Sequence, residues 1–200
     1  MMLDILSAGF ALPFPADAED GDYILNPDAT DVLRGQNLRD AAVWIAIVQH
    51  HNSPSVILTK RSANLRKHTS QIAFPGGTID VGDASAVDAA LREAEEEIGL
   101  PRHIPEIIGQ LPDYISGSGF RIKPVVALVP PLQHLMLNPD EVEEAFEVPL
   151  MFLMNPENHM RASREWQGKE RFYYEMPYQQ HRIWGVTAGI IRAFYERVFA

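Results

Sequence analysis

Residues 74–100 read FPGGTIDVGDASAVDAALREAEEEIGL, and this stretch decides how the rest of the chain is interpreted. The double glycine near its start predicts a tight turn, because glycine adopts backbone conformations that other residues avoid. A helix is predicted to follow, since Ser85 and Asp88 fit a capping box at its start and Gly99 fits its C-terminal cap. Apolar residues recur at helical spacing and form one stripe along it: Val87, Leu91, Ala94 and Ile98.

Glutamates crowd the second half of this predicted helix. Glu93, Glu96 and Glu97 stand at i, i+3 and i+4 and share one face, whereas Glu95 points away. Like charges at this spacing destabilise a helix by roughly 0.2–0.5 kcal/mol per pair, and the C-terminal end of a helix favours cations. A solvated acidic face is one interpretation. The other is a site for Mg²⁺ or Mn²⁺, which prefer hard oxygen ligands and keep positions free for substrate phosphates.

The bulk composition sets limits on the function. The chain has 200 residues, a formal net charge of −10 and no cysteine. These values exclude disulfides, thiolate metal sites and a cysteine nucleophile, and they argue against unspecific nucleic-acid binding. They are compatible with a small anionic substrate at a local cation. No apolar run reaches the ~18 residues of a membrane span. We expect a cytoplasmic monomer or homodimer without nucleic-acid or membrane partners.

One domain is predicted over residues 40–200, preceded by an N-terminal arm, residues 1–39, that packs on it as a short helix and polar loops. Residues 41–48 and the run SVILTK after HHNSP predict a hairpin of buried strands. Further strands are expected at 107–111, 123–130, 143–149, 171–176 and 181–185, with Pro124 and Pro130 bracketing the second, a short helix after residue 149 and a C-terminal amphipathic helix from Thr187. Mixed strands and helices indicate an α/β or α+β fold with a mixed sheet.

The run from Arg92 to Leu100 resembles the second half of the Nudix hydrolase box, which reads Arg-Glu, apolar, any, Glu-Glu, any, Gly, apolar. Gly77 matches the first glycine of the box. At the spaced acidic position stands Asp83 in place of glutamate, and eight residues separate it from Arg92 where the family has seven; Asp83 is either a ligand or a helix cap. The resemblance implies the Nudix fold, in which a mixed β-sheet is sandwiched between α-helices.

The preceding segment, residues 57–77, is similar to the signature of the coenzyme A pyrophosphatase branch of that family, in its bacterial form. Ser70 stands where the signature has glycine, which is expected to alter the backbone of that loop. This resemblance implies Mg²⁺- or Mn²⁺-dependent cleavage of coenzyme A, or a derivative, into 3′,5′-ADP and 4′-phosphopantetheine. The matching residues are Thr59, Arg61, Ser62, Arg66, Phe74, Pro75, Gly76 and Gly77.

The box also implies the roles of the acidic residues. Glu93 and Glu97 are the first choice for metal ligands, and Glu96 is a further ligand, directly or through water. Arg92 orients a glutamate, or forms a structural ion pair. The proton of the attacking water goes to a carboxylate within hydrogen-bond reach. Glu93 and Glu96 are candidates for this base, and Glu141 and Glu144 in NPDEVEEAF are outside candidates.

Candidate substrate-binding residues lie upstream. Arg61, Arg66, Lys67 and His68 form the densest basic segment of this acidic chain, so we predict that they bind phosphate oxygens, including the 3′-phosphate of coenzyme A. A solvated basic loop is the alternative. Gly76 and Gly77 let the backbone approach the pyrophosphate, or form only a turn. Weaker candidates are Arg121 and Lys123 for phosphate. Tyr114 and Phe120 are candidates for stacking on adenine, although a core or rim position is the favoured interpretation for both.

Two other functions compete with this interpretation. One is hydrolysis of another nucleoside diphosphate derivative, such as ADP-ribose, a dinucleoside polyphosphate or an oxidised nucleotide. The other is a nucleotide-sensing module of the same fold without catalysis, which the intact half-box disfavours. Isopentenyl diphosphate isomerase chemistry is excluded, because it uses a cysteine and this chain has none.

Overall fold

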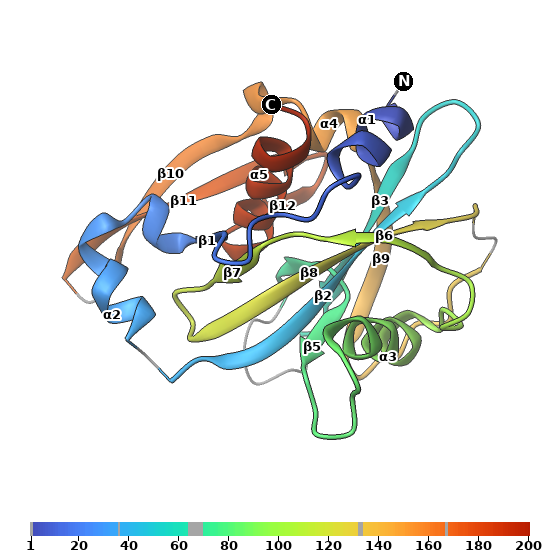
Figure 1. The fold of residues 1–200 in the computed structure, drawn as a ribbon, viewed down its shortest axis with the longest axis horizontal. Helices are drawn as coiled ribbons and strands as arrows, with labels where there is room; N and C mark the ends of the chain where they lie inside the picture. The colour runs from blue at the N-terminus through green and yellow to red at the C-terminus, as the bar shows by residue number, and fades with distance from the viewer. Residues whose placement is uncertain (1, 36, 64–69, 132–133, 167) are drawn as a thin grey trace.

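The structure is a computed structural model that describes residues 2–35, 37–63, 70–131, 134–166 and 168–200. Its main sheet follows the order β1-β7-β8-β2-β3-β4, with β5 on β2, β6 on β8 and β9 on β3 (Figure 1). The pairs β2–β8 and β1–β7 are parallel and the others antiparallel. The strands are β1 (Glu19–Gly21), β2 (Arg39–Val48), β3 (Ser55–Arg61), β4 (Ile72–Ala73), β5 (Gly76–Thr78), β6 (Glu106–Gln110), β7 (Asp113–Ile115), β8 (Phe120–Val129) and β9 (Val142–Pro149).

A second, antiparallel sheet has the order β10-β11-β12. Its strands are β10 (Met160–Trp166), β11 (Lys169–Tyr178) and β12 (His181–Trp184). The α-helices are α1 (Met2–Gly9), α2 (Thr30–Arg34), α3 (Ala86–Ile98), α4 (Leu150–Leu153) and α5 (Val186–Val198), and short 3₁₀ turns span Asp22–Ile24, Pro27–Ala29 and Pro156–Asn158. Across the described residues, none of these helices has the length and apolar character that a membrane span needs.

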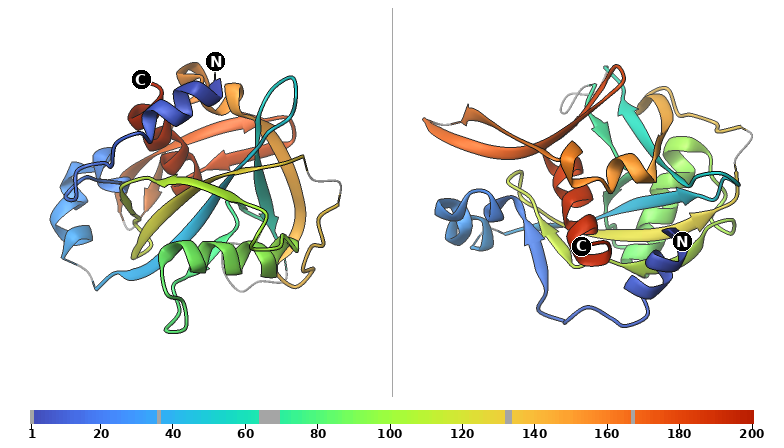
Figure 2. Two further views of the ribbon diagram at one scale, coloured as in Figure 1. Left: turned by 45° about the vertical axis from the view of Figure 1, so that its right-hand side comes forward. Right: turned by 90° about the horizontal axis from the view of Figure 1, so that it is seen from above.

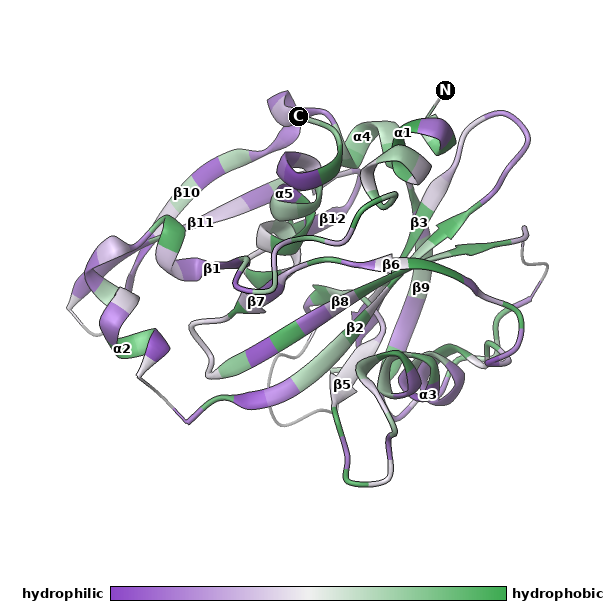
Figure 3. Ribbon diagram, in the orientation of Figure 1, coloured by the Kyte–Doolittle hydropathy of each residue, from purple (hydrophilic) through white to green (hydrophobic). Residues whose placement is uncertain are grey.

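Helices cover both faces of the main sheet because side chains of a strand alternate between faces. On β2, Ala42, Trp44 and Ala46 pack with α3, whereas Ile45 and Ile47 belong to the core on the side of α1 and α5 (Figures 1 and 2). Burying one such large apolar side chain contributes about 1.5–3 kcal/mol. Figure 3 shows the hydrophobic middle of β2 and the hydrophilic end that precedes it. The predicted mixed sheet between helices is confirmed.

Residues from the predicted N-terminal arm contact the domain at two places. Leu6 of α1 is 1% exposed and belongs to the core that includes α5. Further along, β1 pairs in parallel with β7, and Asp20 of β1 accepts hydrogen bonds from Arg197 of α5. The sequence predicted no strand here, because three residues with two acidic side chains carry no strand pattern.

The predicted hairpin of β2 and β3 is confirmed by the pairs Ile47↔Val56 and Val48↔Ser55. The expected position of Pro124 before its strand is wrong, since β8 already begins at Phe120. Proline has no N–H to donate to a neighbouring strand. Pro124 is tolerated because the pairing of β7 with β8 stops before it, at Ile122, and the pairing of β6 with β8 starts after it, at Val125. Its carbonyl accepts from Leu111 N–H at 3.0 Å.

Candidate active site

The helix that carries the acidic cluster begins and ends at the predicted caps. Ser85 Oγ accepts a hydrogen bond from the Asp88 N–H at 3.1 Å. Gly99 adopts a left-handed conformation with φ of 70°, and its N–H donates to the Glu95 carbonyl. Such caps satisfy backbone groups that a helix end leaves unpaired. The alternative that Asp83 caps this helix is wrong, because Ser85 holds that position and Asp83 binds Arg92.

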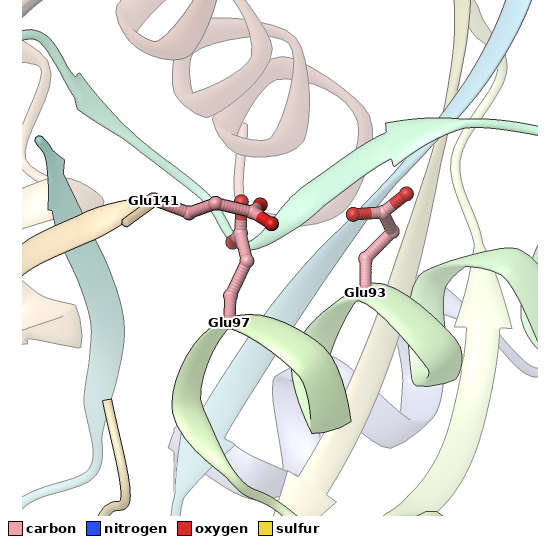
Figure 4. Close-up of side chains that lie close together, drawn as sticks. All are labelled: Glu93, Glu97 and Glu141. Atoms are coloured by element: carbon pink, nitrogen blue, oxygen red, sulfur yellow. The ribbon is translucent and has the colours of Figure 1, made fainter. Parts of the chain in front are cut away.

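Three carboxylates converge beside this helix. Glu93 and Glu97, one turn apart on α3, and Glu141, directly before β9, each place one oxygen within 4.8 Å of the others (Figure 4). Figure 4 shows the Glu141 side chain reaching from its strand across the top of the Glu97 side chain. Two of the three residues come from the predicted ligand set, and the third was an outside candidate for the base.

Backbone contacts at the end of α3 bring Glu141 to this position. The Asn138 N–H donates to the Glu97 carbonyl at 3.0 Å, so the loop satisfies a carbonyl in the last turn of α3. Asn138 Nδ2 then donates to Glu141 Oε1 at 3.3 Å. On the other side, the Ser62 N–H donates to the Glu141 carbonyl at 2.8 Å. Sequence reasoning missed Asn138, and no local pattern marks a loop residue for this role.

The Glu97 carboxylate is buried and makes only weak contacts with hydrogen-bond donors and positive charges among the described residues. Its residue surface is 2% exposed. Its Oε2 accepts a long hydrogen bond from the Gly76 N–H at 3.3 Å, and its Oε1 lies 3.6 Å from Arg61 Nη1. Burial raises the pKa of Glu97 to about 8; the Arg61 charge opposes this shift, and the carboxylates of Glu93 and Glu141 add to it. A divalent cation would neutralise this charge, so the donor set fits one.

The backbone at the two glycines lies directly against the carboxylates and the sheet. A Cβ built on Gly77 would overlap the Glu93 carboxylate. A Cβ built on Gly76 would lie 2.8 Å from Val43 Cα and even closer to the Ala42 carbonyl, and backbone atoms cannot move aside as a side-chain end can. Backbone atoms therefore require glycine at position 76, whereas a Cβ at position 77 would have to displace the Glu93 side chain. The predicted tight turn is wrong, since both glycines lie in β5 and pair with β2. Burial raises the pKa of Glu93, and its hydrogen bond from Arg92 opposes that shift.

Arg92 is saturated with hydrogen bonds. Its Nε and Nη2 each donate to one Asp83 oxygen at 3.0 Å, and Nη2 also donates to the Thr78 carbonyl. Its Nη1 donates to Glu93 Oε1 at 2.9 Å and to Glu96 Oε2 at 3.1 Å. Arg92 lowers the pKa of Asp83, whose Oδ2 also accepts from the Asp80 N–H. The bidentate pair fixes the guanidinium, which in turn fixes the Glu93 side chain.

The structure does not bring every predicted residue to the cluster. Glu96 stays outside it, with half of its side chain exposed and its Oε2 bound to Arg92. Glu144 lies on β9, and its Oε1 is 3.4 Å from His181 Nε2. Arg61 does reach the cluster, through Glu97. The predicted substrate residues Arg66 and His68, together with Lys67, lie outside the described residues.

The weaker substrate candidates make internal contacts. Tyr114 is 5% exposed and donates to Asp22 Oδ1 at 2.6 Å, which confirms the prediction of a core aromatic and excludes stacking on a base. Phe120 is covered by an arginine side chain. Arg121 and Lys123 each pair with a neighbouring aspartate.

Ser70 adopts a backbone conformation that suits a glycine. Its φ is 57°, in the left-handed region, and its N–H donates to the Arg61 carbonyl at 3.1 Å. A residue with a Cβ adopts this region at a cost of roughly 1–2 kcal/mol. Ser70 therefore occupies a backbone position at which glycine would be less strained.

Comparison with known proteins gives a consistent family. A family model described as the NUDIX domain matches residues 38–174. A protein of Enterobacter sp. (strain 638) named "Uncharacterized Nudix hydrolase NudL" is 43% identical over 162 residues, which cover 81% of this chain and 82% of that protein. The NudL of Escherichia coli (strain K12) is 44% identical over 156 residues, covering 78% and 81% of the two chains.

Solved structures share the fold at low sequence identity. The NUDIX domain of Shewanella oneidensis NrtR, solved with ADP ribose, has a TM-score of 0.52 and 18% identity, covering 88% of this chain and 96% of that chain. A MutT/nudix family protein from Enterococcus faecalis has a TM-score of 0.50 and 15% identity, covering 98% and 69%. At these identities the likeness concerns the fold alone.

Proposed function

Since this chain belongs to the Nudix family, we propose that it is a Mg²⁺- or Mn²⁺-dependent hydrolase that cleaves the pyrophosphate bond of coenzyme A or a derivative, giving 3′,5′-ADP and 4′-phosphopantetheine or its acyl form. The observation that carries the proposal is the convergence of Glu93, Glu97 and Glu141 beside a double-glycine strand. Two carboxylate ligands, Glu93 and Glu97, would leave positions of a cation free for pyrophosphate oxygens and water, with the Glu141 carboxylate beside them.

Glu93 and Glu97 are the proposed cation ligands, because both carboxylates are desolvated and Arg92 holds the first in place. A bound cation supplies charge neutralisation on the pyrophosphate and lowers the pKa of the attacking water. Gly76 and Gly77 are proposed to let the backbone of β5 approach the pyrophosphate, because neither carries a side chain. Glu96 accepts a hydrogen bond from Arg92, as Glu93 does. It is proposed to support the two ligands either through Arg92 or by binding the cation through water.

Glu141 is the proposed acceptor of the proton from the attacking water. The rival candidates Glu93 and Glu96 both accept a hydrogen bond from Arg92, which holds their carboxylates against the guanidinium. The Glu141 carboxylate accepts only from the neutral amide of Asn138 within the described part of the chain. It faces the two proposed ligands, so a water bound between them lies within its reach.

Arg61 is the proposed contact to a pyrophosphate oxygen, because its guanidinium already lies beside Glu97 at the edge of the cluster. Arg66 and His68 are proposed to bind the 3′-phosphate of coenzyme A. The support for these two residues is the similarity of residues 57–77 to the coenzyme A pyrophosphatase signature.

A substrate panel tests the proposed activity. Purified protein with Mg²⁺ or Mn²⁺ is incubated with coenzyme A, dephospho-coenzyme A, ADP-ribose and dinucleoside polyphosphates, and the products are separated by chromatography. We expect the highest kcat/KM for coenzyme A, with release of 3′,5′-ADP. Faster cleavage of ADP-ribose or a dinucleoside polyphosphate would overturn coenzyme A as the proposed substrate. No cleavage of any compound would favour a nucleotide-sensing module without catalysis.

Substitution of Glu141 separates a base from a ligand. Glu141→Gln is expected to lower kcat by about 100-fold or more while Mn²⁺ affinity, measured by electron paramagnetic resonance titration, stays close to wild type. Loss of Mn²⁺ affinity together with kcat would assign Glu141 to the ligand set instead.

A further inference from the structure

The strand β10 forms an open edge of the second sheet. It pairs with β11 along its whole length, from Met160↔Glu175 to Trp166↔Lys169, and no strand in the described parts of the chain lies on its other side. In an antiparallel sheet, alternate residues of such a strand direct their N–H and C=O groups away from the sheet. Figure 2 (right) shows the hairpin of β10 and β11 reaching out past the rest of the molecule.

Two of the charged side chains of β10, Arg161 and Glu165, have no partner of opposite sign among the described residues. Arg161 and Glu165 point to the same face, because they are four residues apart on one strand. In the described residues, Arg161 has an aromatic contact, 4.2 Å from its guanidinium carbon to the Phe172 ring centroid, but no carboxylate partner. Glu165 lies directly opposite Glu170 of β11, and like charges in this position destabilise a sheet.

A second copy of the same strand would satisfy both charges. When two copies of β10 pair antiparallel about a two-fold axis at Ser163, Arg161 of one copy faces Glu165 of the other, and the reverse pair forms as well. The Arg161 guanidinium of each copy then lies beside the Glu165–Glu170 pair of the other copy. No other antiparallel register of β10 on itself places both charges opposite their complements.

The same register also pairs the exposed apolar side chains at the ends of the strand. Met160 is 44% exposed and Trp166 is 55% exposed. In the two-fold arrangement Met160 of one copy faces Trp166 of the other, a contact in which thioether sulfur and aromatic ring attract each other. The small side chain of Ala162 then faces Arg164, which leaves room for the guanidinium that stacks on Trp166.

We propose that β10 is a homodimer interface, in which two copies of this chain join their three-stranded sheets into one continuous antiparallel sheet through the register Arg161↔Glu165. The proposal commits to a second copy because the charge pattern of the strand is complementary to itself under a two-fold axis. It is independent of the proposed hydrolase activity, since neither charge contributes to the carboxylate cluster.

Charge-reversal variants test both the surface and the register. Wild-type protein is expected to dimerise in sedimentation equilibrium at concentrations on the order of 100 µM or lower. Arg161→Glu places two glutamates opposite each other in both 161–165 pairs of the dimer, and Glu165→Arg places two arginines there. Each variant should raise the dimer Kd by about 10-fold or more. The double variant restores complementary pairs and should return the Kd to within about threefold of wild type.

Mixing the two single variants gives a second readout. A chain with Arg161→Glu and a chain with Glu165→Arg are complementary at both pairs, so they should form a heterodimer with an affinity close to that of the wild-type homodimer. A wild-type protein that stays monomeric overturns the proposal, and so does a dimer whose Kd is unchanged by the single reversals. Failure of both the double variant and the mixture to restore association overturns the register.

Discussion

Replacement of Glu97 by glutamine is expected to stabilise the metal-free protein and to abolish its activity. The pKa of Glu97 is raised from an ordinary 4.5 to about 8, mainly by burial. The folded chain therefore binds a proton that the unfolded chain has already released, and the free energy of unfolding falls as pH rises from about 4.5 to about 8. Below this window both states are protonated and the carboxyl group carries no such cost.

The size of the effect follows from the pKa of the folded state. Each pKa unit corresponds to about 1.4 kcal/mol, so ionised Glu97 costs the metal-free fold on the order of 5 kcal/mol above pH 8. Part of this cost comes from the charges of Glu93 and Glu141, which lie beside Glu97. We expect Glu97→Gln to recover about 2–5 kcal/mol at about pH 8.5 and less than about 1 kcal/mol at about pH 5.

Urea denaturation in the presence of a chelator measures this difference across the pH range. Glu95→Gln is the matched control, because Glu95 is exposed on the same helix and pairs with Arg102; its free energy of unfolding should change by less than about 0.5 kcal/mol. Added Mn²⁺ should stabilise wild-type protein and the control but not Glu97→Gln. A Glu97→Gln protein that is no more stable than wild type at high pH, or that keeps its turnover, would refute the reasoning.

Three further substitutions test the surroundings of the cluster. Gly77→Ala forces a Cβ into the Glu93 carboxylate and should lower kcat by about 100-fold; unchanged kinetics would show that this carboxylate can move freely. Ser70→Gly relieves the left-handed strain at φ of 57° and should raise the free energy of unfolding by about 0.5–1 kcal/mol, and a lower melting temperature would contradict this. Arg92→Lys keeps the charge but loses the bidentate bond to Asp83, so kcat should fall by about 10-fold or more while KM stays similar; an unaltered kcat would count against a positioning role.

The parts of the site that the sequence predicted well are those with local geometry. Helix periodicity places Glu93 and Glu97 on one face, and the caps at Ser85 and Gly99 mark both ends of the helix. The same wheel also grouped Glu96 with them, yet its side chain turns to Arg92. A helical wheel gives the direction of Cβ, whereas the partner of a long side chain depends on atoms from other segments.

The positions of the other site residues depend on contacts between distant segments of the chain. Glu141 was named only among several candidates, because its position depends on the loop bond from Asn138 to the last turn of α3. The strand β10 was missed for a different reason. Six of its seven residues are exposed, on both faces, so it lacks the alternation of apolar and polar residues that predicts a half-buried strand.

The distribution of hydrogen bonds around α3 separates structural charges from functional ones. Arg92 and Asp83 satisfy each other with two 3.0 Å bonds, and the pair would be equally stable without any ligand. Glu97, a few residues further along, is almost fully buried and receives only a 3.3 Å backbone bond and a 3.6 Å contact from Arg61. A buried charge left this poorly paired destabilises the fold. The Arg92–Asp83 pair holds Glu93 in a fixed orientation. The Glu97 carboxylate gains its missing partner only when a cation binds. Cation binding is therefore expected to stabilise the domain.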